Sequence, residues 1–188
     1  GSAFISLKTN AFSNLERSTT ISGRVTAAGR GIANVAISDG FSVVLTDSNG
    51  KYTITTDAKA TNVFMSTPSA YEFRNNYNVA RQYETLGARN EYNFEITKLG
   101  QKDNKHHFIV WADPQVKNKK DVKQMMETSV PDVQQLVSSL PKNSLIHGIG
   151  VGDLVWDSLE LFPDYNEAVA QMKIPFFQAL GNHDMDYR

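Results

Sequence analysis

Apolar and polar residues alternate along the first half of the chain with the period of two that half-buried β-strands show. The alternation predicts short strands at residues 20–25, 35–38, 41–46, 51–56, 63–66 and 92–96. The turn Asp47-Ser48-Asn49-Gly50 precedes one of them and places glycine where a positive φ is needed most. This pattern predicts an all-β sandwich over residues 19–99, after an N-terminal segment over residues 1–18.

The pattern changes at His106, after a polar linker over residues 100–105. Continuous apolar runs, typical of strands buried on both faces of a parallel sheet, occur at residues 108–111, 145–151 and 175–180. Apolar residues recur at helical spacing over residues 119–128, 131–140 and 165–172. We expect Ser129 to cap the second helix and Pro131 to lie in its first turn. The order β-α-β-α-β predicts a partial α/β domain over residues 106–188, with parallel strands and right-handed crossovers.

The composition excludes several classes of protein. A hydrophobic fraction of 40% and a charged fraction of 21% are typical of globular domains rather than disordered chains. The net charge of −1 gives no indication of a nucleic-acid or membrane-surface binder. The apolar runs are far shorter than the ~20 residues that span a bilayer, so no membrane span is expected. The absence of cysteine excludes disulfides, zinc fingers and thiol catalysis.

Every predicted strand of the second half runs into residues that commonly bind metals. The three segments are Asp113-Pro114-Gln115, Gly152-Asp153 and Gly181-Asn182-His183-Asp184. In a parallel α/β sheet these segments meet at one edge, where such folds bind their ligands. Carboxylate, amide and imidazole groups suit a divalent cation. One aspartate after a strand most often caps a helix, but three such segments in succession favour a metal site.

These segments resemble the motifs of the calcineurin-like metallophosphoesterases, in an Asp-x-Gln variant. The resemblance implies a centre of two divalent metal ions, manganese, iron or zinc. It implies that Asp113 binds the first metal, Asp153 bridges both, and Asn182 binds the second through its amide oxygen. Gln115 stands where the family usually has histidine, and we expect it to be a weaker ligand through its oxygen. His183 would contact the phosphate and help the leaving oxygen depart.

The same resemblance implies the reaction, which is hydrolysis of a phosphate mono- or diester by a metal-bound hydroxide. The substrate would be a phosphorylated small molecule or another phosphoester, and no nucleic acid is expected. Protein Ser/Thr phosphatases orient the histidine with an acid three residues after the bridging aspartate. Trp156 stands at that place and Asp157 is one residue further on. We expect Asp157 and Asp184 to act as supporting groups behind the metal ligands and His183.

The later His and the Gly-His-x-His motif of this family do not occur in the sequence. The four histidines, His106, His107, His147 and His183, do not replace them by position. We therefore expect the chain to be the N-terminal piece of a longer protein, with an exposed sheet edge, part of the site and little or no activity alone. His147 lies inside a predicted strand and is expected to be a satisfied core histidine.

The first half resembles the carboxypeptidase-regulatory-like or transthyretin-like β-sandwiches, which have an Ig-like architecture. The resemblance rests on residues 21–25, 31–40 and 46–52. Such modules often precede metallophosphoesterase domains in exported proteins of Gram-negative bacteria, which implies a periplasmic or secreted protein whose sandwich packs on the catalytic domain. The alternative function is a non-catalytic binding protein that uses the sandwich, with a degenerate phosphoesterase half. Binding of two divalent ions would favour the enzyme.

Overall fold

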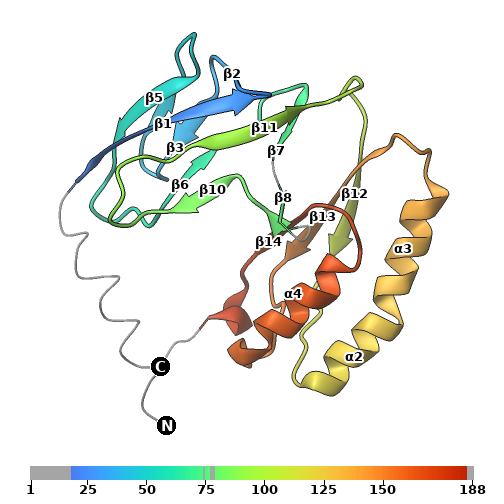
Figure 1. Cartoon of the computed structure of the whole chain (residues 1–188). Helices are drawn as coiled ribbons and strands as arrows, with labels where there is room; N and C mark the ends of the chain where they lie inside the picture. The colour runs from blue at the N-terminus through green and yellow to red at the C-terminus, as the bar shows by residue number, and fades with distance from the viewer. Residues whose placement is uncertain (1–17, 74, 77–78, 186–188) are drawn as a thin grey trace. The chain divides into compact units, whose positions relative to one another are not determined.

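The computed structural model describes residues 18–73, 75–76 and 79–185 (Figure 1). Residues 1–17 of the predicted N-terminal segment therefore lie outside the described part. The chain divides into two compact units, one of residues 1–74 and 81–101 and one of residues 75–80 and 102–188. Among the described helices, none combines the length and apolar character that a bilayer crossing requires.

The described residues of the first unit form two β-sheets. One sheet has the order β2-β1-β11-β7, with β5 also paired to β1; its strands are β1 (Thr20–Ala27), β2 (Arg30–Gly31), β5 (Lys51–Thr55), β7 (Tyr71–Phe73) and β11 (Phe94–Lys98). The other has the order β10-β6-β3-β4; its strands are β3 (Ala36–Ser38), β4 (Val43–Leu45), β6 (Asn62–Met65) and β10 (Tyr83–Thr85). β1 and β11 are parallel, and the other pairs in these sheets are antiparallel.

Each of these sheets buries alternate side chains on one face. In the first sheet the buried residues include Ile21, Val25, Ile54, Phe94 and Ile96, and in the second they include Ile37, Val63 and Met65. Two sheets with one buried face each are the arrangement of a sandwich. The β-rich first half predicted from alternation is therefore confirmed, while the finer transthyretin-like assignment stays a prediction.

A buried tyrosine anchors the first sheet. The hydroxyl of Tyr52 donates a hydrogen bond to the backbone carbonyl oxygen of Tyr92, with 2.6 Å between the oxygens. Burial raises the pKa of Tyr52 well above its ordinary value. The protonated hydroxyl is therefore the form that the folded unit requires.

We expect alkaline pH to destabilise the first unit through Tyr52. An unfolded tyrosine ionises near pH ~10, whereas the raised pKa of folded Tyr52 keeps its proton in place. The stabilisation is fully present below about pH 10 and is lost as the pH rises toward the folded pKa. Urea unfolding followed by circular dichroism at about pH 8 and about pH 11 measures this loss.

Tyr52→Phe is the test variant. Tyr83→Phe is its control, because Tyr83 lies in the same unit but is 37% exposed. Tyr52→Phe should lose less stability between the two pH values than the unchanged chain. Tyr83→Phe should lose as much as the unchanged chain. An identical alkaline loss in both variants would contradict the assignment.

The second unit is built on one mainly parallel sheet. Its parallel strands are β12 (His106–Trp111), β13 (Leu145–Val151) and β14 (Phe176–Ala179). A hairpin of β8 (Asn75–Asn76) and β9 (Val79–Ala80) extends the sheet beyond β14, in the order β12-β13-β14-β9-β8. The partial α/β half is therefore confirmed, and the hairpin joins it from within the stretch that the sequence assigned to the β-domain.

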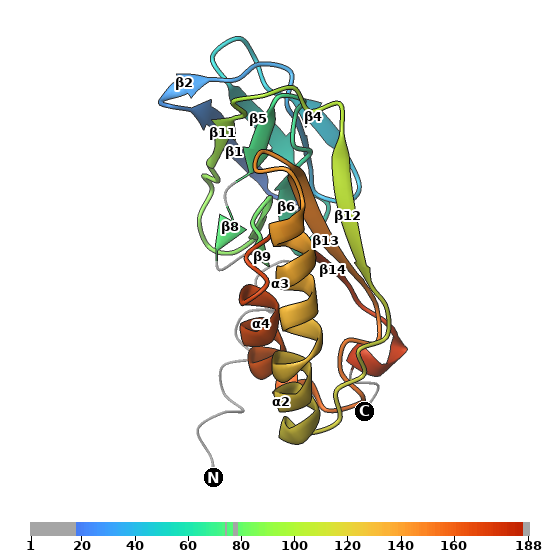
Figure 2. The ribbon, with the colours of Figure 1, turned by 90° about the vertical axis from the view of Figure 1, so that its right-hand side faces the viewer.

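The α-helices described in this unit cover one face of the sheet (Figures 1 and 2). They are α2 (Lys119–Glu127), α3 (Ser129–Ser139) and α4 (Phe162–Ala170), with short 3₁₀ turns η1 (Leu159–Leu161) and η2 (Asn182–Asp184). The side chain of Asn118 caps α2 by accepting the N–H groups of Lys120 and Asp121. The expected cap at Ser129 is wrong: Ser129 is the first residue of α3, and Thr128 precedes it without a capping side-chain bond.

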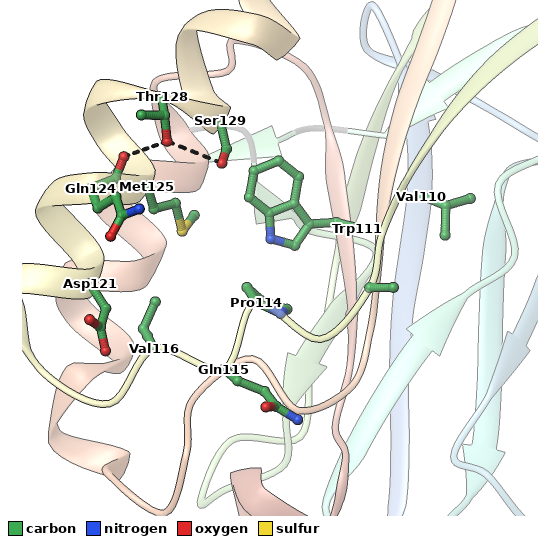
Figure 3. A pocket seen from close by; sticks show the side chains of 11 residues that line it. Val110, Trp111, Pro114, Gln115, Val116, Asp121, Gln124, Met125, Thr128 and Ser129 are labelled. Carbon is green, nitrogen blue, oxygen red and sulfur yellow. Dashed lines mark hydrogen bonds between the residues drawn. The ribbon is translucent and has the colours of Figure 1, made fainter.

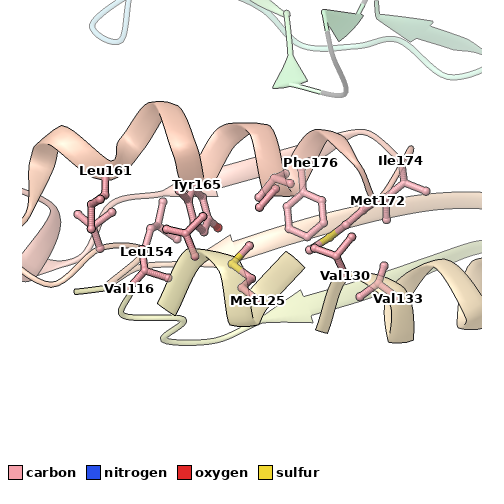
Figure 4. Close-up of a cluster of buried hydrophobic side chains, with 14 residues drawn as sticks. Val116, Met125, Val130, Val133, Leu154, Leu161, Tyr165, Met172, Ile174 and Phe176 are labelled. Atoms are coloured by element: carbon pink, nitrogen blue, oxygen red, sulfur yellow. The ribbon is translucent and has the colours of Figure 1, made fainter. Parts of the chain in front are cut away.

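The core of the second unit lies between these helices and the sheet (Figure 4). Its buried members include Val116, Met125, Val130, Leu154, Tyr165, Met172 and Phe176. The packing positions the loops that follow the strands, because Val116 and Leu154 belong to those loops and are almost fully buried.

The opposite face of this sheet is open along β12. Phe108 is 61% exposed and Val110 is 65% exposed, so the prediction that β12 is buried on both faces is wrong. Right-handed crossovers between strands in the order β12-β13-β14 place both helical connections on the same face. The apolar run therefore reflects packing on one side only.

His147 also departs from its prediction. Its ring packs against His106 with 5.3 Å between centroids, and burial together with His106 lowers the pKa of His147. Its buried Nδ1 has no hydrogen-bond partner within the described residues. The prediction of a satisfied core histidine is therefore wrong.

Candidate functional site

The loops after β12 and β13 hold their candidate residues in an uncommon backbone conformation. Asp113, Gln115, Asp153 and Asp157 have φ values of 42°, 44°, 48° and 56°. Non-glycine residues in this region carry strain and tend to gather at functional sites. The two loops are joined because the backbone N–H of Gln115 donates to the carbonyl oxygen of Asp153 at 3.0 Å.

The loop after β14 approaches the β13 loop at a glycine. A Cβ atom at Gly181 would lie 2.1 Å from Oδ1 of Asp153 and 2.4 Å from its backbone nitrogen. Gly152 beside it has a φ of 101°, which favours glycine. The backbone N–H of His183 donates to Oδ1 of Asp153 at 3.2 Å. These two glycines therefore permit the two loops to approach each other closely.

Asp184 fixes the backbone of both loops. Asp184 is 4% exposed, and its side chain accepts hydrogen bonds from three backbone N–H groups. The donors are Leu154 at 3.0 Å, Val155 at 2.8 Å and Gly181 at 2.9 Å. Asp184 was expected to support the site, and the structure shows it bonded to backbone rather than to the imidazole of His183.

His183 is paired with the other supporting candidate. Its Nδ1 lies 3.0 Å from Oδ1 of Asp157, and the backbone N–H of Asp157 donates to the carbonyl oxygen of His183 at 3.0 Å. A carboxylate can only accept, so Nδ1 carries the proton. The other ring nitrogen, Nε2, then remains available for a ligand. An acid four residues after Asp153 thus reaches the histidine, with Asp157 in the left-handed conformation.

The donor chemistry of the site fits an oxygen-ligated cation in part. The side chains of Asp113, Gln115 and Asn182 form no hydrogen bond or ion pair with the described residues. Together with Asp153 they offer two carboxylates and two amides, which hard divalent cations accept. Across the described part of the chain, however, no group of three or more His, Cys, Asp or Glu side chains forms a metal site. The residues present therefore form an incomplete donor set.

A cavity of about 520 Å³ lies beside the β12 loop, between that loop and the end of α2 (Figure 3). Its walls include Trp111, Pro114, Gln115, Asp121, Met125 and Ser129. Gln115 lines this cavity, but Asp113, Asp153, Asn182 and His183 do not. The structure thus brings Asp153, Asp157 and His183 together by direct contacts. Asp184 bonds to the backbone of the two loops, and Gln115 lines the cavity.

One aromatic contact at the site was not predicted. The rings of Trp156 and His183 are stacked, with 3.9 Å between centroids and 16° between planes. From the sequence alone, Trp156 is only the residue at the place of a missing acid. The signal that was available is its position, three residues after Asp153 in the loop that also carries Asp157.

No curated protein and no solved structure matches the chain. A family described as the N terminal of calcineurin-like phosphoesterase matches residues 19–99. This match covers less than half of the chain and falls on the β-rich half, before the segment that carries the candidate site. Residues 19–99 are thus similar to the N-terminal region of calcineurin-like phosphoesterases.

Proposed function

We propose that the second unit carries part of a metal-dependent phosphoesterase site that hydrolyses a phosphate mono- or diester. The observation that carries this proposal is the Asp157–His183 pair, whose histidine also contacts the carboxylate of Asp153 through its backbone. The similarity of residues 19–99 to a region that precedes phosphoesterase domains supports the same class of substrate.

The metal ligands in this proposal are Asp113, Asp153, Asn182 and Gln115. They would hold two divalent ions, manganese, iron or zinc, with Asp153 shared between them. Such ions neutralise the charge of a phosphoryl group and activate water at neutral pH. The oxygen-only donor set favours manganese among these three ions.

His183 acts as the proton donor to the leaving oxygen. Its Nδ1–H is held by the carboxylate of Asp157, so the proton is delivered from Nε2. The carboxylate also stabilises the positive charge that the ring carries before transfer. Imidazole suits this role because it exchanges protons near neutral pH.

Binding of Mn²⁺ by the chain tests the ligand assignment. We expect Asp153→Asn to weaken Mn²⁺ binding by about tenfold or more, because a shared carboxylate is replaced by a neutral amide. Asparagine tolerates the positive φ at this position and still accepts the His183 N–H, so the loop should keep its structure. Isothermal titration calorimetry gives the affinity, with Asp132→Asn on the exposed side of α3 as the control.

Equal Mn²⁺ affinity in Asp153→Asn and the unchanged chain would contradict the proposed ligands. Absence of any Mn²⁺ binding would favour the non-catalytic binding function instead. We also expect little or no turnover of p-nitrophenyl phosphate by the 188-residue chain, because the donor set is incomplete. Robust metal-dependent turnover would show that the chain carries a whole site.

A further inference from the structure

The imidazole of His183 is held from two directions. Asp157 accepts the Nδ1–H within the ring plane, and Trp156 covers a ring face with a centroid separation of 3.9 Å. The hydrogen bond fixes one atom but still permits the ring plane to rock about it. A stacked aromatic face opposes that motion, because tilting the ring would separate the two surfaces.

The hydrogen bond between Asp157 and His183 is open to water on the Asp157 side. The Asp157 side chain is 65% exposed, whereas that of His183 is 24% exposed. Hydrogen bonds and ion pairs at exposed carboxylates compete with water and contribute little to order. The face contact with Trp156 is therefore the more persistent of the two restraints on the ring.

Trp156 is itself anchored to both loops. Its backbone N–H donates to the carbonyl oxygen of Val116 at 3.0 Å, and Val116 pairs with Val155 in an isolated parallel bridge. Both valines are almost fully buried. The ammonium group of Lys117 lies 4.5 Å from the centroid of the Trp156 ring, so the indole has a second partner.

We propose that Trp156 is a positioning residue for His183, holding the imidazole plane so that Nδ1 stays on Asp157 and Nε2 remains available. The indole of Trp156 thus shares with the carboxylate of Asp157 the task of orienting the His183 ring. The catalytic consequence rests on the proposed phosphoesterase function, but the positioning of the ring does not.

Nuclear magnetic resonance of the ¹⁵N-labelled chain tests the positioning directly. The ¹⁵N shifts of the two ring nitrogens distinguish a histidine that carries its proton on Nδ1 from one that carries it on Nε2. We expect His183, assigned by its loss in His183→Gln, to be protonated at Nδ1 with ring protons shifted by the indole ring current. Trp156→Ala should lose the shift and move the tautomer toward the mixture of a free histidine.

Three further variants separate positioning from a general loss of structure. Trp156→Phe keeps an aromatic face and should retain the Nδ1–H tautomer. Trp156→Leu keeps much of the volume without the face and should behave like Trp156→Ala, which keeps the test valid if the alanine variant does not fold. Trp111→Phe changes the other tryptophan of the same unit and should leave the His183 signals unchanged.

An unchanged His183 tautomer in the folded Trp156→Leu or Trp156→Ala variant would overturn the proposal. In a preparation with phosphoesterase turnover, Trp156→Leu should lower kcat about tenfold or more with KM unchanged, and Trp156→Phe should restore most of it. Altered His183 signals in these variants, in a chain that binds no Mn²⁺, would reject the proposed function and keep the positioning role. Unaltered His183 signals in a chain that binds Mn²⁺ through Asp153 would reject the positioning role and keep the proposed function.

Discussion

Replacing Asp184 with alanine is expected to destabilise the second unit by at least about 3 kcal/mol, since each buried unpaired donor costs ≈ 1–3 kcal/mol. The substitution removes the acceptor of three backbone N–H groups at once, those of Leu154, Val155 and Gly181. Water cannot replace the carboxylate without entering the packed loops. This is the largest effect on stability that we expect from removing one polar side chain.

Urea unfolding followed by tryptophan fluorescence measures this effect in the second unit alone, because both tryptophans, Trp111 and Trp156, belong to it. Asp184→Asn should lose less stability than Asp184→Ala, since one acceptor oxygen remains. Asp132→Ala on exposed α3 should stay within about 0.5 kcal/mol of the unchanged chain. A loss below about 1 kcal/mol in Asp184→Ala would show that the donors find other partners.

Gly181→Ala is expected to disrupt the candidate site and to destabilise the second unit by about 2–3 kcal/mol, the upper range for overpacking. The new methyl group would lie 2.1 Å from Oδ1 of Asp153 and 2.4 Å from its backbone nitrogen. Rotation of the Asp153 side chain removes only the first clash. The β13 loop therefore has to move away, and Asp153 moves with it.

Two measurements check this prediction: the free energy of unfolding by fluorescence and the affinity for Mn²⁺. Both should fall in Gly181→Ala. Gly100→Ala is the control, because a Cβ atom there meets no atom within 4 Å. Retention of both properties in Gly181→Ala would mean that the loops separate at little cost and that their close approach is not required.

The sequence predicted the parts of the fold that depend on local pattern. The apolar run of β13 has the same bounds in the prediction and the structure, Leu145–Val151. Such apolar runs end where the chain leaves the sheet. The sequence therefore also predicted that Asp113, Asp153 and Asn182 lie just after strand ends. Alternation located β1 and β5 for the same reason, because each strand buries every second side chain.

Features that depend on distant contacts were beyond the sequence. The two-residue strands β2, β8 and β9 are too short to show a period. The sequence named Asp157 as a supporting group, but its contact with His183 depends on a left-handed backbone conformation that the spacing of residues does not reveal. The open face of β12 follows from which strands neighbour each other, and an apolar run alone does not contain that information.

The β8–β9 hairpin has a consequence for how the protein is divided. Residues 75–80 leave the sequence of the first unit to pair with β14 and then return, before the chain passes finally into the second unit at residue 102. The polypeptide therefore passes between the units three times, and neither unit is an uninterrupted stretch of the gene. An exon or cloned fragment that ends near residue 100 carries away two strands, β8 and β9, of a sheet that it does not otherwise encode.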